Sequence, residues 1–332
     1  MDTPRLASLD ALVRAVTARG GPLRVAIAPC AEEFVLRAAL HAAAAGLAEP
    51  VFLGDMARTH AVAERLGLDL SAFERQDCPD DIQAVTLAVD YFRQGRAQLI
   101  MKGLVSTSTV LKAVLVKDAG LVPAGGILSH VTVFDAPGCG PEEDGGPGGQ
   151  GRPQRLMLLT DAGVNIRPTL QRKVEILKNA LAVARSLGIA RPRAAMLAAT
   201  EKVNYPAMPA TLDADIIAKM ASSGEFGDAL VAGPLALDLA VSPSAAAMKG
   251  MDNPVAGQAD ILCTPDIESG NILYKALNSL MNITLASVVV GSRVPVVVPS
   301  RGDSEHSKFA SIALAAYLAA NQNSADQNGD PQ

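Results

Sequence analysis

The sequence predicts an α/β protein in which helices cover mainly parallel strands. Short runs rich in Val, Ile and Leu alternate with amphipathic segments, which is the pattern of successive βαβ units. Aromatic residues make up only 3% of the 332 residues and Trp is absent, so Ala, Val, Leu and Ile must fill the core. Such small aliphatic residues suit helices on a parallel sheet better than an aromatic-rich β-sandwich.

The first half of the chain contains the clearest alternation of strands and helices. Residues 23–28 and 50–55 predict strands on either side of an Ala-rich helix at 31–46. Farther along, an amphipathic helix is expected at 80–95, and a strand follows at 97–101. The segment therefore predicts consecutive βαβ units, although it lacks the G-x-G-x-x-G and Walker patterns of the usual nucleotide sites.

The strand at 97–101 is followed by a turn that contains basic and hydroxyl groups. Lys102 and Gly103 lead into Ser106 and Thr107, and Lys112 follows on the same expected helix. The N-H groups at a helix N-terminus favour anions, so a phosphate is one possible occupant. Simple capping of the helix by Ser106 or Thr107 is the other interpretation, and the sequence leaves both open.

The second half repeats the alternation. Strands are predicted at 156–160, 194–199, 229–232 and 260–263, and Pro168 and Thr169 begin an amphipathic helix. Most of these strands end in Gly, Pro, Asp or Asn, which is typical of parallel sheets with a site at one edge.

The composition argues against several classes of function. The formal net charge is -5 and no basic block is present, so neither nucleic acid nor an anionic membrane is the expected main partner. The four cysteines have no paired metal spacing, which favours a reduced cytosolic setting. The N-terminus has no apolar signal-peptide core, so a soluble, cytoplasmic protein is expected.

Two segments are expected to lie outside the packed core. Residues 136–155 are dense in Gly and Pro and predict a flexible loop or linker near a domain boundary. Residues 319–332 are rich in Asn, Gln, Asp and Ser without an apolar period, so we expect a disordered tail.

The stretch 295–308 contains the strongest local signal for a site. An apolar run short enough for a buried strand ends in Ser300, Arg301 and Gly302, and several ionisable residues follow. Ligands of open α/β sheets bind beyond the carboxyl ends of strands, where a hydroxyl and a guanidinium can hold an anion. Taken alone, the stretch is equally compatible with a strand that leads into a solvated helix N-terminus.

A set of ordered stretches links the chain to a known family. They are 101–105 with Lys112, 128–131, 160–162 with 165–166, 208–213, 233–238, 254–260, 265–271 with 274–275, and 295–301. On these stretches the chain resembles the phosphate acetyltransferase and phosphate butyryltransferase family over about residues 20–318. The variants at 208–213 and 233–238 look closer to the butyryl-type branch.

The resemblance implies a fold and a reaction. The fold is two α/β domains with mainly parallel sheets and an interdomain cleft, similar to isocitrate and isopropylmalate dehydrogenases. Residues 1–135 with 292–318 would form the first domain and 156–291 the second. The implied reaction is reversible transfer of an acetyl or butyryl group between CoA and phosphate through a ternary complex in a homodimer or larger oligomer. CoA and phosphate would be substrates, with no cofactor, metal or covalent acyl-enzyme.

The resemblance also implies roles for particular residues. Ser300 would donate to the developing oxyanion or phosphate, and Arg301 would clamp the anion. Lys112 stands where acetyl members have an arginine, so the planar fork is lost there. Plausible substrate-binding residues are Lys102, Lys112, Ser129, Asn271 and Lys275.

One position departs from the family pattern. Acetyl members carry an aspartate seven positions after the serine as the expected base for the CoA thiol, and this chain has Ser307 there. A serine does not accept a proton at neutral pH without help. Asp303, Glu305 or His306 can substitute, or the thiol can lose its proton to water. Our hypothesis is that Asp303 or Glu305 is the base.

Two other classes of function compete with the acyltransferase. A metal-dependent hydroxy-acid dehydrogenase of similar architecture would need an aspartate cluster and a cofactor loop, and neither is recognisable in the sequence. A non-catalytic protein that binds acyl-CoA or phosphate would keep the site but not the base, and the serine at position 307 is compatible with that alternative.

Overall fold

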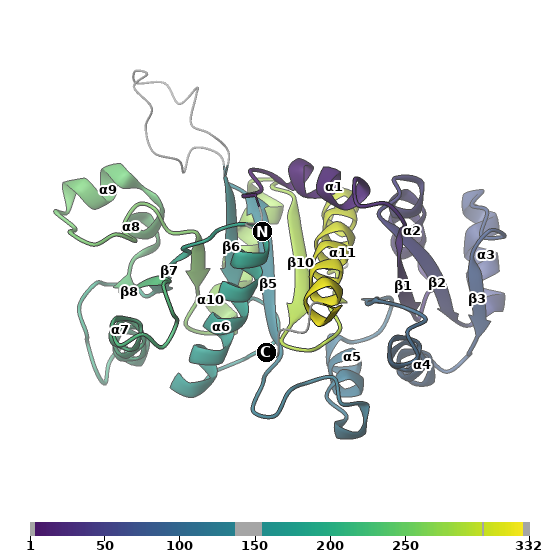
Figure 1. The fold of residues 1–332 in the computed structure, drawn as a ribbon, viewed down its shortest axis with the longest axis horizontal. Helices are drawn as coiled ribbons and strands as arrows, with labels where there is room; N and C mark the ends of the chain where they lie inside the picture. Colours follow the sequence, from purple (N-terminus) through teal and green to yellow (C-terminus); the bar gives the residue numbers. More distant parts are fainter. Residues whose placement is uncertain (1–3, 137–154, 301, 328–332) are drawn as a thin grey trace, which may run out of the picture. The chain divides into compact units, whose positions relative to one another are not determined.

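The computed structural model describes residues 4–136, 155–300 and 302–327 (Figure 1). The chain forms two compact units, and each contains its own run of hydrogen-bonded strands. The middle unit consists of Met1–Leu9 and Ser129–Ile283, and the outer unit consists of Asp10–Leu128 and Thr284–Gln332. The predicted α/β class is confirmed, since helices and mainly parallel strands alternate in both units.

The sheet of the outer unit has the strand order β3-β2-β1-β4-β11-β10. Its strands are β1 (Leu23–Ala28), β2 (Ala48–Gly54), β3 (Glu74–Asp77), β4 (Leu99–Lys102), β10 (Leu285–Val290) and β11 (Val296–Val297). All neighbouring pairs are parallel except β10 with β11. From β1 the chain moves outward to β2 and β3, and it then returns to the other side of β1 to form β4. The sheet therefore reverses its strand order between β1 and β4.

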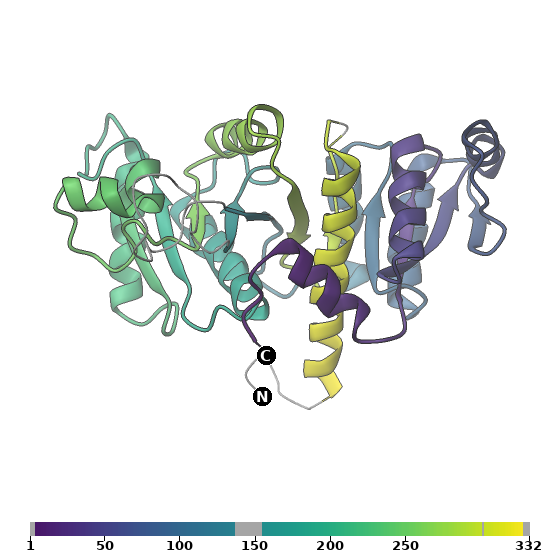
Figure 2. The ribbon, with the colours of Figure 1, turned by 90° about the horizontal axis from the view of Figure 1, so that it is seen from above.

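Six α-helices accompany these strands. They are α1 (Leu9–Thr17), α2 (Glu33–Ala44), α3 (Met56–Leu66), α4 (Asp81–Arg93), α5 (Thr107–Val114) and α11 (Glu305–Gln327), and Lys117–Ala119 forms a 3₁₀ turn. Helix α2 packs beside α11, as Figure 2 shows, whereas α4 packs on α5 and on β1. Alanines on the buried face of α2 let this helix approach the sheet closely. Right-handed crossovers place α2 and α4 on opposite faces of the sheet.

The sheet of the middle unit has the order β5-β6-β9-β7-β8. Its strands are β5 (Ser129–Asp135), β6 (Leu156–Thr160), β7 (Arg193–Leu197), β8 (Leu230–Leu235) and β9 (Ile261–Cys263). Only β5 with β6 is antiparallel. The helices are α6 (Leu170–Ser186), α7 (Pro209–Ser222), α8 (Leu237–Val241), α9 (Pro243–Met248) and α10 (Ile267–Lys275), which the π-helical turn Ala276–Leu280 extends.

The division of the chain differs from the predicted domains at several points. Residues 129–135, assigned to the first domain from the sequence, belong to the middle unit, and 284–291 belong to the outer unit rather than to the second domain. Helix α11 continues to Gln327, so 319–327 are helical where a disordered tail was predicted. Alanines near the end of α11 sustain the helix without an apolar period. The predicted Gly/Pro-rich loop falls mainly on 137–154, outside the described residues.

The described helices contain no candidate for a membrane span, because none of them is both long enough and sufficiently apolar.

Candidate active site

The carboxyl ends of β1, β4 and β11 come together in the outer unit. Met101 pairs with Ile27 of β1 on one side and with Val297 of β11 on the other. The turns that follow these three strands line a small cavity, which we name the β4/β11 cavity. Its lining residues are Glu32, Phe34, Val35, Lys102, Gly103, Leu104, Val105, Pro299, Ser300 and Lys308. The cavity lies where the strand order reverses, which is where open α/β sheets bind their ligands.

Gly103 allows the turn after β4 to lie against the turn after β1. Its amide donates to the carbonyl of Ala28, and a Cβ added at Gly103 would lie 1.7 Å from the Pro29 carbonyl oxygen. No side chain fits in that space, so the contact requires glycine. The backbone of two strand ends therefore forms one wall of the cavity.

Lys102 lies at the end of β4 and folds over the turn that follows. Its Nζ donates to the carbonyl oxygens of Gly103 and Val105, each at 3.1 Å. The predicted site residue therefore lines the cavity, and its ammonium also stabilises the turn that begins α5. At the N-terminus of α5, the Ser106 hydroxyl accepts from the Thr109 amide, which confirms the capping interpretation at that position.

Ser300 and Asp303 form a closed turn after β11. The Ser300 amide donates to Asp303 Oδ2 at 2.7 Å, and the Asp303 amide donates to the Ser300 carbonyl at 3.1 Å. The Asp303 side chain is buried, with 8% of the residue exposed. This carboxylate therefore holds the turn that presents Ser300. Arg301 lies outside the described residues.

Glu305 and Lys112 do not line the cavity. Glu305 begins α11 with about half of its side chain exposed, and its Oε1 lies 3.8 Å from Nδ1 of His41. Lys112 is exposed in the last turn of α5. Of the predicted residues in the outer unit, Lys102 and Ser300 line the cavity, and Asp303 supports the turn beside it.

Ser307 has a structural contact in the described chain. Only 1% of the residue is exposed, and its Oγ accepts from the Leu285 amide at 3.0 Å while the Ser304 hydroxyl donates to it at 3.1 Å. The hydroxyl thereby fixes the first turn of α11 to the start of β10. The position at which the family resemblance implies a base is thus part of the packing in this chain.

Lys308 is a cavity residue that received no role from the sequence. It is 3% exposed, its Nζ donates to the carbonyl oxygen of Asp303, and this nitrogen lies 5.2 Å from the centre of the Phe34 ring. Desolvation lowers the pKa of the Lys308 ammonium, and the nearby charges of Asp303, Glu32 and Glu305 oppose that shift. Lys308 ends a run of ionisable residues that is equally typical of a solvated helix N-terminus, so no local pattern signals its burial.

The other predicted residues belong to the middle unit. Ser129 is buried at the start of β5, and its hydroxyl lies 2.9 Å from the donating Nδ2 of Asn179. Asn271, on α10, donates to the carbonyl of Ala162 at 3.2 Å, and the Lys275 Nζ lies 5.1 Å from the ring centre of Tyr274. These side chains gather near the carboxyl end of β6 and on α10, within the middle unit.

The turn after β6 centres on Asp161, which the sequence did not single out as a site residue. Its Oδ1 accepts from the amides of Gly163 and Val164 at 2.9 Å, and its Oδ2 accepts from the Asn165 amide at 3.2 Å and from Asn165 Nδ2 at 2.6 Å. The carboxylate is buried, with 3% of the residue exposed. Its acceptor capacity is therefore used within its own turn.

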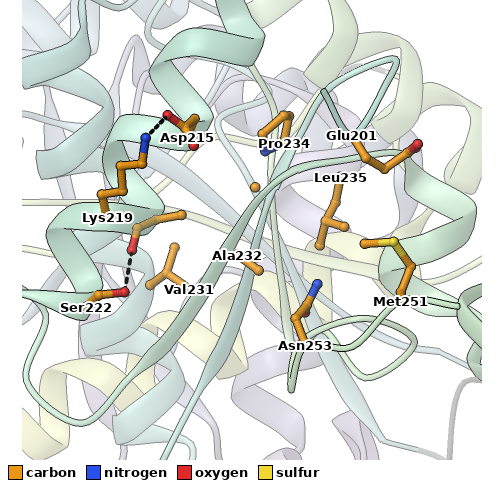
Figure 3. A pocket seen from close by; sticks show the side chains of 12 residues that line it. Glu201, Asp215, Lys219, Ser222, Val231, Ala232, Pro234, Leu235, Met251 and Asn253 are labelled. Carbon is orange, nitrogen blue, oxygen red and sulfur yellow. Dashed lines mark hydrogen bonds and ion pairs between the residues drawn. The ribbon is translucent and has the colours of Figure 1, made fainter. Parts of the chain in front are cut away.

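A larger cavity of about 340 Å³ lies along β8 and α7 in the middle unit (Figure 3). Lys219 and Asp215 form an ion pair of 2.7 Å in its wall, and the Ser222 hydroxyl donates to the Ala218 carbonyl. The other labelled residues are Val231, Ala232, Pro234 and Leu235 of β8, with Glu201, Met251 and Asn253 from neighbouring loops. None of the predicted site residues lines this cavity, and its third charged residue, Glu201, pairs with Lys249 at 2.7 Å.

Metal ligands do not gather in the described parts of the chain. No group of three or more His, Cys, Asp or Glu side chains there has an arrangement that could hold a metal ion. The cysteines that the structure describes are free, and burial raises the pKa of Cys30 to about 11 and that of Cys263 to about 12. Thiols with such pKa values are weak nucleophiles at neutral pH.

Residues 80–316 match the family model described as phosphate acetyl/butaryl transferase. The chain belongs to this family. It is 39% identical over 299 residues to a phosphate butyryltransferase of Clostridium acetobutylicum, an alignment that covers 90% of this chain and 94% of the relative. It is 37% identical over 302 residues to a phosphate acetyltransferase of Thermotoga maritima, which covers 91% and 97% of the two chains.

Solved structures support the same assignment. A branched-chain phosphotransacylase from Enterococcus faecalis matches with a TM-score of 0.76 and 33% identity, covering 90% of this chain and 99% of the other. A 4-hydroxythreonine-4-phosphate dehydrogenase from Klebsiella pneumoniae matches with a TM-score of 0.51, 13% identity and coverage of 91% and 99%. The second likeness concerns the fold alone, so the dehydrogenase-like architecture has only distant support.

Proposed function

We propose that this chain catalyses the reversible transfer of a short acyl group between coenzyme A and inorganic phosphate. Family membership over residues 80–316 supports this class of reaction. The structural observation that supports it best is the β4/β11 cavity, where Ser300 and two lysines meet at the reversal of strand order. An anionic substrate and a developing oxyanion need hydroxyl and cationic groups of this kind.

The proposed chemistry needs no covalent enzyme intermediate. A phosphate oxygen attacks the thioester carbonyl, so a C–O bond forms, and the C–S bond then breaks with release of the CoA thiolate, which takes up a proton. We assign to Ser300 the donation of a hydrogen bond to the oxyanion or phosphate, and to Arg301 the anion clamp. Lys102 at the cavity, together with Lys112, Ser129, Asn271 and Lys275, completes the proposed set of substrate-binding residues.

We propose Asp303 or Glu305 as the proton acceptor for the CoA thiol. Asp303 lies beside Ser300, and one of its carboxylate oxygens accepts the Ser300 amide. Glu305 is more exposed and lies near His41. Of the two proposed bases we favour Asp303, because its carboxylate contacts the backbone of Ser300, the residue that we assign to the oxyanion or phosphate.

The acyl group and the assembly are also part of the proposal. Relatives named for acetyl and for butyryl transfer match this chain with similar identity, so either group is a candidate substrate. We propose transfer through a ternary complex in a homodimer or larger homo-oligomer in the cytoplasm. The interdomain cleft implied by the resemblance stays a prediction.

The test is phosphate-dependent release of free CoA thiol from acetyl-CoA and butyryl-CoA by the purified full chain. We expect thiol release only when phosphate is present, with formation of an equal amount of acyl phosphate. A parallel reaction without phosphate measures simple hydrolysis. If a series of short acyl-CoAs gave no phosphate-dependent thiol, the proposed function would be wrong.

A further inference from the structure

Lys308 has an unusual environment for a lysine. It lies in the first turn of α11, 3% of the residue is exposed, and it lines the β4/β11 cavity together with Ser300 and Lys102. In the described ranges, no carboxylate oxygen lies within 4.0 Å of the Lys308 Nζ, which is the distance limit for an ion pair. A buried cation without a close anion is rarely found unless a ligand supplies the negative charge.

The contacts of this ammonium leave part of its donor capacity unused. An ammonium has three N-H donors, and a single one satisfies the hydrogen bond to the Asp303 carbonyl oxygen. The Phe34 ring lies 5.2 Å away and stabilises the positive charge from one side. The remaining donors are available to a group in the cavity that the side chain lines.

We propose that Lys308 is a phosphate-binding residue of this acyl-transfer site, whose buried ammonium neutralises an anionic group held beside Ser300. This proposal rests on the proposed function. The bond from Nζ to the Asp303 carbonyl also joins the ammonium to the turn that presents Ser300. Binding of an anion and ordering of that turn are therefore coupled.

The lowered pKa of the Lys308 ammonium agrees with this role, because desolvation is its first cause. A phosphate group beside the ammonium would restore the favourable charge that water supplies elsewhere. Asp303, Glu32 and Glu305 act on the ammonium at longer range, and their negative charges oppose this lowering of its pKa.

A purely structural role is the competing explanation. In that case Lys308 would only hold the Asp303 carbonyl, and any good donor at this position would suffice. Lys308→Gln separates the two roles, because the glutamine amide keeps an N-H donor and removes the charge. Lys308→Arg provides the complementary variant, since it keeps the charge and changes the shape.

Steady-state kinetics of the full chain provides the first measurement. We expect Lys308→Gln to raise the KM for phosphate by about 10- to 100-fold, as befits the loss of a charge-assisted hydrogen bond, while the KM for acyl-CoA changes by less than about twofold. Lys308→Arg should recover part of the phosphate affinity. Lys219→Met is the matched control, because that lysine has a 76% exposed side chain in the middle unit and should leave both KM values unchanged.

Thermal unfolding with inorganic phosphate provides a measurement that does not depend on activity. We expect phosphate to raise the Tm of the wild-type chain and of Lys219→Met, with sodium chloride at equal ionic strength as the reference. The Lys308→Gln chain should show less than half of that rise. Without phosphate its Tm should equal or exceed that of the wild type, because the variant no longer buries a charge.

The outcomes are distinguishable. A Lys308→Gln chain with a wild-type KM for phosphate and a wild-type phosphate response would overturn the proposal, as would a variant with a lower Tm whose phosphate response is intact. If the wild type released no CoA, the proposed function would fail, while the phosphate-dependent Tm of the wild type and Lys308→Gln would still decide whether Lys308 binds the anion.

Discussion

Two turns at the carboxyl ends of strands bury charge in opposite ways. After β6, in the middle unit, the Asp161 carboxylate accepts four hydrogen bonds from its own turn. After β11, in the outer unit, the Lys308 ammonium contacts one carbonyl and an aromatic ring, and the other groups around it form a cavity. The two turns occupy equivalent places in an α/β layout, so position alone does not reveal a ligand site.

The role of a buried charge is therefore indicated by the hydrogen-bond partners that the protein itself supplies to it. A carboxylate whose oxygens already accept several hydrogen bonds from its own turn stabilises that turn and has little acceptor capacity left for a substrate. A buried ammonium with spare donors next to a cavity is better suited to bind an anion. Removing one group at a time from each kind of environment tests this difference.

The largest effect is expected for Asp161→Ala. The substitution leaves several buried N-H donors without their acceptor, so the free energy of unfolding should fall by about 3–4 kcal/mol. Urea denaturation monitored by circular dichroism measures this loss. Asp161→Asn, which keeps one acceptor oxygen, should lose less. A fully stable Asp161→Ala chain would show that the turn does not depend on its carboxylate.

The next largest effect is expected for Ser300→Ala, and it should concern activity. Loss of a hydrogen-bond donor to the oxyanion should lower kcat by about 100-fold, with a change in unfolding free energy of less than about 0.5 kcal/mol. Phosphate-dependent CoA release and urea denaturation give the two values. Unchanged kcat would remove Ser300 from the proposed chemistry.

Ser304→Ala is the matched control for Ser300→Ala. The Ser304 hydroxyl accepts from the Ser307 amide at 3.1 Å, which caps the first turn of α11. Its loss should therefore cost about 1 kcal/mol of stability and leave kcat unchanged. This outcome would separate the residue that stabilises the helix start from the residue that acts in the cavity.

The smallest effect is expected for Glu74→Gln at the opposite end of the outer sheet. Arg24 donates to the Glu74 carboxylate and is the main cause of its lowered pKa; desolvation opposes the shift, and Tyr91 and Arg96 donate as well. A lowered folded-state pKa stabilises the fold above the ordinary carboxyl pKa, and this contribution disappears as the pH falls through the folded value.

The unfolding free energy of the wild type should therefore exceed that of Glu74→Gln by about 1 kcal/mol at pH 7, and the difference should vanish in acid. Unfolding free energies measured from pH 7 down to pH 3 test this expectation. CoA release at pH 7 should be the same for both chains, because this charge is compensated far from the cavity residues in the sheet. A pH-independent difference would mean that the ion pair does not cause the effect.

The sequence predicts those elements whose side chains follow a clear period. The strands β1 and β6 confirm predictions from mainly apolar runs, and helix α4 confirms one from apolar residues at helical spacing. Strand β3 has the sequence Glu-Arg-Gln-Asp at an edge of the sheet, so it has no apolar signal. Strand β5 begins with Ser129 and His130, and polar residues at a buried strand start obscure its pattern.

The site was predictable only in part. The rule for strand ends correctly brings Lys102 and Ser300 to one cavity, since β4 and β11 are parallel neighbours. The structural role of Ser307 and the burial of Lys308 depend on contacts with Leu285 and Phe34, which are remote in sequence. Such long-range packing is not encoded in local spacing.

The two-residue strand β11 lies far after β4 in the chain, so the sheet of the outer unit is completed late during synthesis. Strand β4 forms early in the chain, but its neighbour β11 leaves the ribosome only after the whole of 129–283. Until then the edge of β4 lacks its partner and the turn with Ser300 does not exist. A nascent chain thus gains the Ser300 turn, and with it the complete lining of the β4/β11 cavity, only after 129–283 have been translated.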